Sequence, residues 1–387
     1  MGRRVSWRSV LPVVMGFALL GCPIGPRVKA GANVRYQRIQ VVGDAPRGGM
    51  ADPTIAYDST GKVGWLAYSA VQGNMKPVGG PYIETHIARS TDHGRTWNFA
   101  GVVNRSTDAT GDLTAMKKGR QEGVWRFEVP TLVNDPGDPG REWKLFAHNY
   151  FALKNKQQER LPMYGWISMQ TAHDPAGPWS EPIPLLGSGK NPPAPYNHTR
   201  IDIDSLSKDV ADVAFYTEPG AFQKNGVLYL SLTARYPDPR LVLLSSSDHG
   251  RSWRFAGTLT TPRDSKDLGF KLLDASAIAE QQGRVFLLFC GDAGRPMHNG
   301  TIIVEFEDLA HGRLRRDANG RLAIEKTIPG QGPEMTPAGA GQAGYSEYNS
   351  AGGLVMAQPK LEMLPAFFQL WSTGQDLIGA GGARSAR

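Results

Sequence analysis

The chain has 387 residues, of which 40% are apolar and 20% are charged, and this composition excludes an intrinsically disordered protein. Its 46 glycines and 28 prolines follow no fixed period, which excludes a collagen-like chain and indicates many tight turns. The net charge of +7 is spread along the chain, so we expect weak attraction to anionic surfaces and no nucleic-acid partner.

The first residues predict an export signal. Arginines at positions 3, 4 and 8 precede an apolar stretch over 10–20 that is too short to cross a membrane as a helix. The stretch ends in Leu-Leu-Gly-Cys at 19–22, which resembles the bacterial lipobox. That resemblance implies a signal peptide over 1–22 and a lipid on Cys22, which would anchor an exported protein in a bacterial cell envelope. An ordinary signal peptide is the alternative.

Only two cysteines are present, so a lipidated Cys22 leaves Cys290 without a partner for an internal disulfide. Cys290 ends a hydrophobic run over 284–290, which predicts a buried structural thiol. We expect the stability of the protein to come from its hydrophobic core.

The rest of the chain is typical of an all-β protein. Short runs rich in β-branched and aromatic residues are separated by Gly, Pro, Asn and Asp, and helical patterns are scarce. We expect one domain over 34–378, after a linker over 23–33 and before a flexible tail over 379–387. The predicted strands are 53–57, 63–68, 83–89, 130–133, 144–147, 163–170, 227–233, 241–246, 285–289, 301–306, 353–357 and 366–371. A sandwich, a barrel or a propeller would fit this pattern.

An internal repeat favours the propeller. The sequence Ser-Thr-Asp-His-Gly-Arg-Thr-Trp at 90–97 returns at 246–253 as Ser-Ser-Asp-His-Gly-Arg-Ser-Trp. In such a turn the Asp accepts backbone N–H bonds, the Gly adopts a positive φ and the Trp packs beneath the loop. The residues concerned are Asp92, Gly94, Trp97, Asp248, Gly250 and Trp253. The motif resembles the Asp-box, or BNR repeat, of sialidase-like β-propellers, where it is structural.

A second repeat places an acidic residue at the opening of each predicted innermost strand. The five residues are Asp52, Glu128, Glu218, Asp274 and Glu347. They predict five blades, roughly over 51–104, 124–186, 214–260, 268–326 and 344–378, with a strand over 34–42 closing the ring. Six blades are the alternative, with the additional blade near 105–123 or 190–213.

Innermost strands line the channel of a propeller, so we expect the five acids to gather at one end of that channel. Crowded carboxylates repel one another unless some are protonated, paired with arginine or bound to a cation. Glycoside hydrolysis uses such a set, since one carboxylic acid protonates the leaving oxygen and a second carboxylate activates water or attacks the anomeric carbon. The same set of carboxylates could instead bind a cation such as calcium on the channel axis. We expect no cofactor and no dedicated metal site.

The architecture resembles five-bladed glycoside hydrolases as well as sialidase-like proteins. In the five-bladed enzymes an Asp-Pro of the first blade supplies the base, which implies this role for Asp52. A Glu in a Glu-Pro or Glu-x-Pro setting supplies the acid, which implies Glu218, with Glu128 as the second match. Their middle Asp has no counterpart here, because this chain carries Glu128 instead. The candidate substrate-binding residues are Asp274, Glu347, Arg47, Arg126, Trp125, His198 and Tyr348.

Two other functions remain open. An exo-sialidase would need three arginines and a Tyr–Glu pair, for which Tyr345 or Tyr348 with Glu347 is the candidate pair. A non-catalytic, monomeric propeller that binds a carbohydrate or a protein at the cell envelope would need no complete set of catalytic groups.

Overall fold

The computed structural model describes residues 34, 36–72, 82–155, 159–187, 199–211, 213–292, 300–329, 340–350, 353–360 and 367–378. The predicted signal peptide over 1–22 with Cys22, the linker over 23–33, the tail over 379–387 and His198 lie outside these residues. Within the described residues, no helix combines the length and the apolar character needed to cross a lipid bilayer.

The regular secondary structure of the described chain is almost entirely β-strand, and its strands form mostly antiparallel groups that follow one another along the sequence. The first group is β3 (Gly49–Tyr57), β4 (Gly64–Val71), β5 (Ile83–Ser90) and β6 (Trp97–Asn104). The second is β7 (Thr107–Leu113), β8 (Gly119–Asn134), β9 (Trp143–Leu153), β10 (Arg160–Ala172), β11 (Ile183–Gly187) and β12 (Ile201–Asp202). Short 3-10 turns cover Thr114–Met116 and Ile203–Ser205.

The third group is β13 (Phe215–Lys224), β14 (Val227–Arg235), β15 (Arg240–Ser246) and β16 (Arg254–Thr258). A short helix, α1 (Pro262–Asp267), leads to the fourth group. That group is β17 (Leu272–Gln281), β18 (Arg284–Asp292), β19 (Thr301–Asp308), β20 (Arg313–Leu314) and β21 (Ile324–Ile328). The last is β22 (Ala340–Gly344), β23 (Val355–Lys360) and β24 (Phe367–Ser372).

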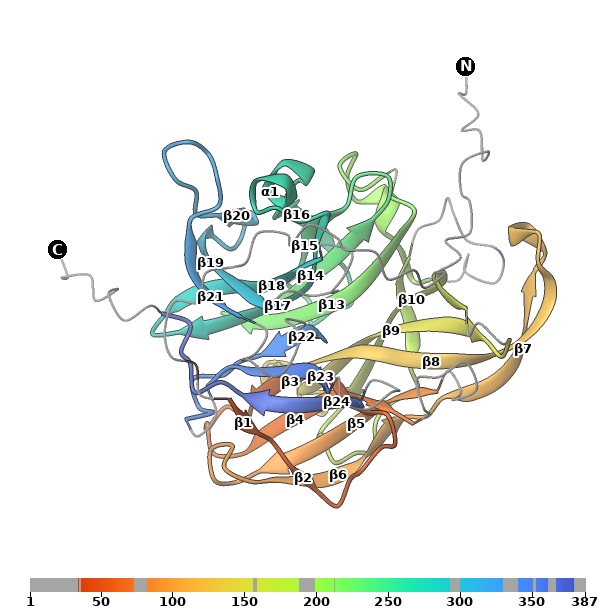
Figure 1. Ribbon diagram of the computed structural model, residues 1–387, viewed down its shortest axis with the longest axis horizontal. Helices are drawn as coiled ribbons and strands as arrows, with labels where there is room; N and C mark the ends of the chain where they lie inside the picture. The colour runs from red at the N-terminus through yellow and green to blue at the C-terminus, as the bar shows by residue number, and fades with distance from the viewer. Residues whose placement is uncertain are drawn as a thin grey trace.

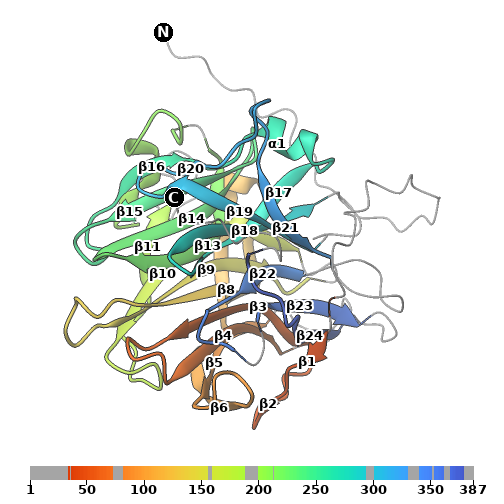
Figure 2. The same ribbon diagram turned by 90° about the vertical axis from the view of Figure 1, so that its left-hand side faces the viewer.

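The groups close into a ring. The innermost strands β3, β8, β13, β17 and β22 contact one another in that order, and β22 contacts β3. Both views place β22 between β17 and β3 (Figure 1, Figure 2). Near the N-terminus, β1 (Gln37–Arg38) pairs with β24, whereas β2 (Val41–Val42) pairs with β6. The predicted closing strand over 34–42 is therefore divided between the last and the first group.

This arrangement confirms the predicted all-β propeller fold. The described strands form four hydrogen-bonded sheets, because a short parallel pairing of β3 with β24 joins the first and the last of the five groups, and the blade count of the whole chain stays a prediction. Residues 107–123, one place considered for a sixth blade, instead extend the second group through β7 and the start of β8. Figure 1 shows this extension projecting at the right-hand edge of the view.

The alternation of side chains between the two faces of a strand explains why the strands in the middle of each group, such as β14 and β18, are hydrophobic throughout. Leu228 and Leu230 of β14 pack in the core between the second and third groups, whereas Tyr229 packs between the third and fourth. In β18, Phe286 packs toward the last group and Leu287 toward the third. Successive side chains point to opposite faces, so a strand sandwiched between two groups is apolar on both. Equivalent clusters fill the remaining interfaces.

The repeated turns over 90–97 and 246–253 have the same hydrogen bonds. Asp92 accepts from the backbone N–H of Thr96 at 2.9 Å, and Asp248 accepts from that of Ser252 at 2.9 Å. The glycines have φ of 85° and 86°, and both tryptophans are buried. Burial raises the pKa of Asp248, but the hydrogen bonds outweigh it, and in both turns the hydrogen bonds lower the pKa of the carboxyl to about 2. Both turns follow the third strand of a group, so they lie at the rim opposite the start of the innermost strands.

Candidate active site

A β-bulge recurs in four innermost strands, near the start of β3, β13 and β17 and in the middle of the longer β8, at the end of the ring that we call the mouth. The bulged pairs are Asp52-Pro53, Val129-Pro130, Glu218-Pro219 and Ala275-Ser276. The first residue of each pair has a positive φ: 49° at Asp52, 53° at Val129, 56° at Glu218 and 50° at Ala275. A bulge re-aims side chains and increases the local twist. The same backbone feature therefore presents Asp52, Glu128, Glu218 and Asp274 at one end of the ring.

Glu218 and Asp274 share one cation. Nη2 of Arg235 lies 3.2 Å from Glu218 and 3.1 Å from Asp274, which places the two carboxylates side by side. Glu218 also accepts from the backbone N–H of Ala275 at 2.9 Å and from the Thr233 hydroxyl at 3.1 Å. Burial lowers the pKa of Arg235, but the two carboxylates outweigh burial and raise it above its ordinary value.

Glu128 is bound differently. Arg126 donates to its carboxylate at 3.0 Å, and the Tyr150 hydroxyl donates to the other carboxylate oxygen. The Arg126 guanidinium also lies 5.0 Å from the centre of the Tyr150 ring. Burial raises the pKa of Glu128, but Arg126, Arg160 and the Tyr150 hydrogen bond outweigh it and hold the pKa below its ordinary value. Glu128 is therefore a carboxylate at neutral pH.

Electrostatic coupling joins Asp52 to this set. Tyr150, Glu128 and Asp52 raise the pKa of Arg160, so the charge of Asp52 acts on the same guanidinium as that of Glu128. His148 of β9 is the register partner of Glu128; burial lowers the pKa of His148 to about 4, and the charge of Arg235 adds to this shift. His148 is consequently neutral at pH 7, while carboxylates and arginines surround it.

The structure does not bring Glu347 to the mouth, and this corrects the alignment of the last predicted blade. The innermost strand β22 ends at Gly344, so Glu347 follows that strand and does not open it. Its carboxylate accepts from the backbone N–H of Gln282, in the turn at the far end of β17. Tyr348 lies at the same opposite rim, where its ring is 5.8 Å from that of Tyr57. Neither residue belongs to the mouth.

Trp125 and Arg126 point to opposite faces of β8, because adjacent residues of a strand alternate. Arg126 is on the face of Glu128. Trp125 instead joins an aromatic cluster, with ring centres 5.0 Å from Trp166 and 5.2 Å from Phe151. Trp125 therefore lies on the face of β8 away from Glu128, and its role in substrate binding stays a prediction. Arg47 is exposed on the turn that precedes β3.

Sequence reasoning missed the roles of Arg235, Arg160, Tyr150 and His148. The Asn225–Gly226 turn offers a signal for Arg235, because a two-residue Asn-Gly loop fixes the register of its hairpin. Counting back from the pair Lys224–Val227 places Arg235 opposite Tyr216, and the bulge at Glu218-Pro219 then shifts it by one residue to Phe215, so Arg235 lies close to Glu218. The second group has no such short turn, since residues 135–142 separate β8 from β9. Without a short turn to fix the register, the pairing of β8 with β9 across its bulge cannot be counted along the sequence.

Among the described residues, one group has metal-ligand spacing, and it lies away from the mouth. Asp135, Asp138 and His249 approach one another at the opposite rim. The Lys144 ammonium lies 2.9 Å from Asp135 and 3.2 Å from Asp138, so it supplies the positive charge that a cation would bring. His249, from the repeated turn over 246–253, contacts Asp135 at 2.9 Å.

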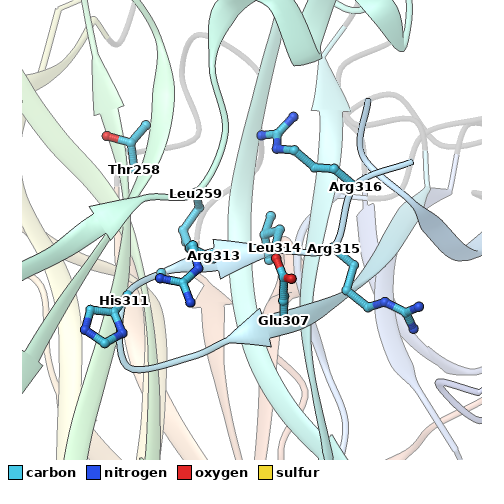
Figure 3. A pocket seen from close by; sticks show the side chains of 9 residues that line it. Thr258, Leu259, Glu307, His311, Arg313, Leu314, Arg315 and Arg316 are labelled. Carbon is cyan, nitrogen blue, oxygen red and sulfur yellow. The ribbon is translucent and has the colours of Figure 1, made fainter. Parts of the chain in front are cut away.

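A cavity of about 430 Å³ lies at the outer edge of the third and fourth groups, away from the mouth (Figure 3). It is lined by Thr258, Leu259, Glu307, His311, Gly312, Arg313, Leu314, Arg315 and Arg316. Its arginines are paired with acids: Arg313 with Asp308, Arg315 with Glu305 and Arg316 with Asp264. The cavity therefore offers little uncompensated positive charge to an anion.

No protein-family model matches the sequence, and no curated protein matches it. Solved structures do resemble the fold. Bombyx mori GH32 beta-fructofuranosidase BmSUC1 matches with a TM-score of 0.51 and 12% identity, over 88% of this chain and 61% of that chain. Zg3597, a family 117 glycoside hydrolase of Zobellia galactanivorans, matches with a TM-score of 0.49 and 13% identity, over 89% and 90%. The alpha-L-arabinofuranosidase PaAbf62A of Podospora anserina matches with a TM-score of 0.49 and 10% identity, over 88% of this chain and 96% of that chain. At these identities the likeness is one of fold alone, that of a β-propeller.

Proposed function

We propose that this protein is a glycoside hydrolase that cleaves a glycosidic bond at the mouth of its propeller. The observation that carries the proposal is the repeated bulge that presents Asp52, Glu128, Glu218 and Asp274 together, with arginines between them. Glycoside hydrolysis needs two carboxyl groups with different proton affinities on opposite sides of a sugar.

Glu218 is the proposed general acid. It shares Arg235 with Asp274, so two carboxylates face a single guanidinium. A proton bound by this pair relieves the repulsion between the two negative charges. Delivered from Glu218 to the glycosidic oxygen, the proton lets the aglycone leave as an alcohol while the sugar ring becomes oxocarbenium-like and is attacked by water. Asp52, presented by the equivalent bulge of the first group, takes a proton from the attacking water.

Glu128 is a poor acid, because its arginine and tyrosine partners favour its charged form. We assign it to stabilising the positive charge that develops on the sugar ring and to positioning the substrate. This assignment replaces the alternative in which Glu128, in its Glu-x-Pro setting, protonates the leaving oxygen. Asp274 and Arg126 complete the polar lining of the site.

Turnover tests the proposal. Wild-type protein is assayed with chromogenic glycosides and with plant and bacterial glycans, beside Asp52→Asn, Glu218→Gln and Glu128→Gln. Each substitution keeps the size of its side chain, so circular dichroism and melting curves should match those of the wild type. We expect one glycoside class to be hydrolysed, and turnover to fall by about 100-fold or more in the Asp52 and Glu218 variants. Binding of a glycan without turnover would favour the non-catalytic alternative.

One observation favours exo-sialidase activity as a second candidate. Tyr150 and Glu128 form a Tyr–Glu pair, and Arg126, Arg160 and Arg235 lie around it. Arg126 and Arg235 are already bound to carboxylates of the protein, so they are less available to a substrate carboxylate, and a neutral glycan is favoured. If the native protein hydrolyses an aryl sialoside and Tyr150→Phe does not, exo-sialidase activity becomes the favoured function in place of the hydrolysis of a neutral glycan.

Export and anchoring are part of the proposal. The lipobox-like residues 19–22 and the basic residues before them support cleavage before Cys22 and lipid attachment to its thiol. Mass spectrometry of the mature N-terminus should find a diacylglyceryl cysteine in the membrane fraction. Release of a Cys22→Ser variant into the soluble fraction is the expected counterpart, and an unmodified Cys22 in the mature protein would contradict the assignment.

A further inference from the structure

Tyr236 is an exposed aromatic residue at the mouth. It directly follows β14, whose last residue, Arg235, contacts both Glu218 and Asp274. Its exposed fraction is 58%, the largest among the bulky hydrophobic residues that the structure describes. Tyr348, the other exposed tyrosine in that set, lies at the opposite rim and is 46% exposed.

The backbone of Tyr236 is held in an unusual conformation. Its φ is 50°, which is a rare value for a bulky side chain and persists where the surrounding structure imposes it. The backbone N–H of Ala214 donates to the carbonyl oxygens of both Arg235 and Tyr236, at 3.2 and 2.9 Å. Arg240 donates to the carbonyl oxygen of Asp238 at 2.8 Å and so braces the same turn. A ring that packs little against its own protein is therefore mounted on a fixed backbone.

Such a ring suits the apolar C–H face of a sugar. Stacking buries an aromatic face at a low cost in side-chain entropy, and the neighbouring Arg235 and Asp274 offer polar partners for hydroxyl groups. We infer that Tyr236 is a stacking platform for the sugar unit adjacent to the one that lies between Asp52 and Glu218. This inference rests on the proposed function, and it deepens it by assigning a substrate of at least two linked sugars.

Affinity electrophoresis tests the platform without requiring turnover. The parent protein carries Glu218→Gln, and the gels contain arabinan, arabinoxylan, levan or xyloglucan. We expect at least one polysaccharide to retard the parent, and Tyr236→Ala to weaken its affinity by about three- to tenfold. Tyr236→Phe keeps the ring and should bind like the parent. Tyr348→Ala removes an exposed tyrosine from the opposite rim and should also bind like the parent.

The outcomes separate this inference from the proposed function. Equal binding by Tyr236→Ala and the parent, while native protein hydrolyses the same polysaccharide, overturns the platform and leaves the hydrolase standing. Binding that depends on Tyr236, with no hydrolysis by native protein, supports the platform and contradicts the hydrolase. If none of the four polysaccharides retards the parent, the platform for neutral linked sugars is wrong.

Discussion

Lys144 carries a buried charge that should be costly to remove. Its side chain is fully buried between two carboxylates, Asp135 at 2.9 Å and Asp138 at 3.2 Å, and it also donates to the carbonyl oxygen of Arg141 at 3.0 Å. Replacing it with methionine keeps most of the volume and deletes the ammonium. Asp138 would still have the guanidiniums of Arg141 and Arg251, at 3.3 and 2.9 Å. Among the described residues, the ring of His249, at 2.9 Å, would be the ion-pair partner still in contact with Asp135.

Removing one partner of a buried ion pair generally costs about 3–5 kcal/mol, because the other charge stays buried without compensation. For a domain of this size, that range corresponds to a melting temperature lower by about 5 °C. The loss is concentrated on Asp135, whose side chain is 0% exposed. A second substitution, Asp135→Asn, should therefore restore part of the lost stability in the Lys144→Met background.

Calorimetry or denaturant unfolding of the purified domain measures this effect. Lys118 is the matched control, because it also pairs with a carboxylate, Glu159 at 2.9 Å, while both side chains are about one-third exposed. Lys118→Met should change the stability by less than about 1 kcal/mol. If Lys144→Met melts within a degree of the wild type, the buried charge network is wrongly described.

Two further predictions concern the first and third groups. A Cβ at Gly220 would lie 2.2 Å from a backbone carbonyl oxygen of β17, so Gly220→Ala should destabilise the protein by about 1–3 kcal/mol. Gly101→Ala is the control, because a Cβ there would have nothing within 4 Å. Equal melting temperatures of the two variants would contradict the close contact at Gly220. Burial lowers the pKa of His86, but Asp44 and Glu84 outweigh burial and raise it. Protonated His86 therefore stabilises the folded protein, and this contribution is complete below the unfolded-state pKa and lost as the pH rises through the folded-state pKa. His86→Gln should therefore lower the melting temperature more at about pH 5.5 than at about pH 9, and a larger effect at pH 9 would refute this sign.

The sequence allowed the fold and part of the site to be predicted because they rest on local chemistry. Turn residues such as Gly94 and Gly250 are required by a positive φ, and the hydrophobic runs follow from burial on both faces. Asp52 and Glu218 were found because each precedes a proline in a bulge. These signals lie within a few residues of one another, so they can be read along the chain.

Other features depend on pairings that the sequence does not display. Glu347 has the same local setting as the other acids, yet it lies beyond β22 because the last innermost strand begins earlier in the chain. Tyr150 reaches Glu128 only because the bulge shifts the register between β8 and β9. Trp125 turned away from the site through strand alternation, which a shift of one residue would have reversed.

The dependence of the rate on the leaving group tests the central claim most directly, namely that Glu218 donates the proton and Asp52 assists the attack at the mouth. Native protein and the two variants are compared on a pair of glycosides with the same sugar, one with a dinitrophenyl and one with an alkyl leaving group. Glu218→Gln should retain hydrolysis of the dinitrophenyl glycoside and lose that of the alkyl glycoside, since an acidic leaving group needs little protonation. Asp52→Asn should lose both. Equal retention of both activities in either variant would contradict the claim.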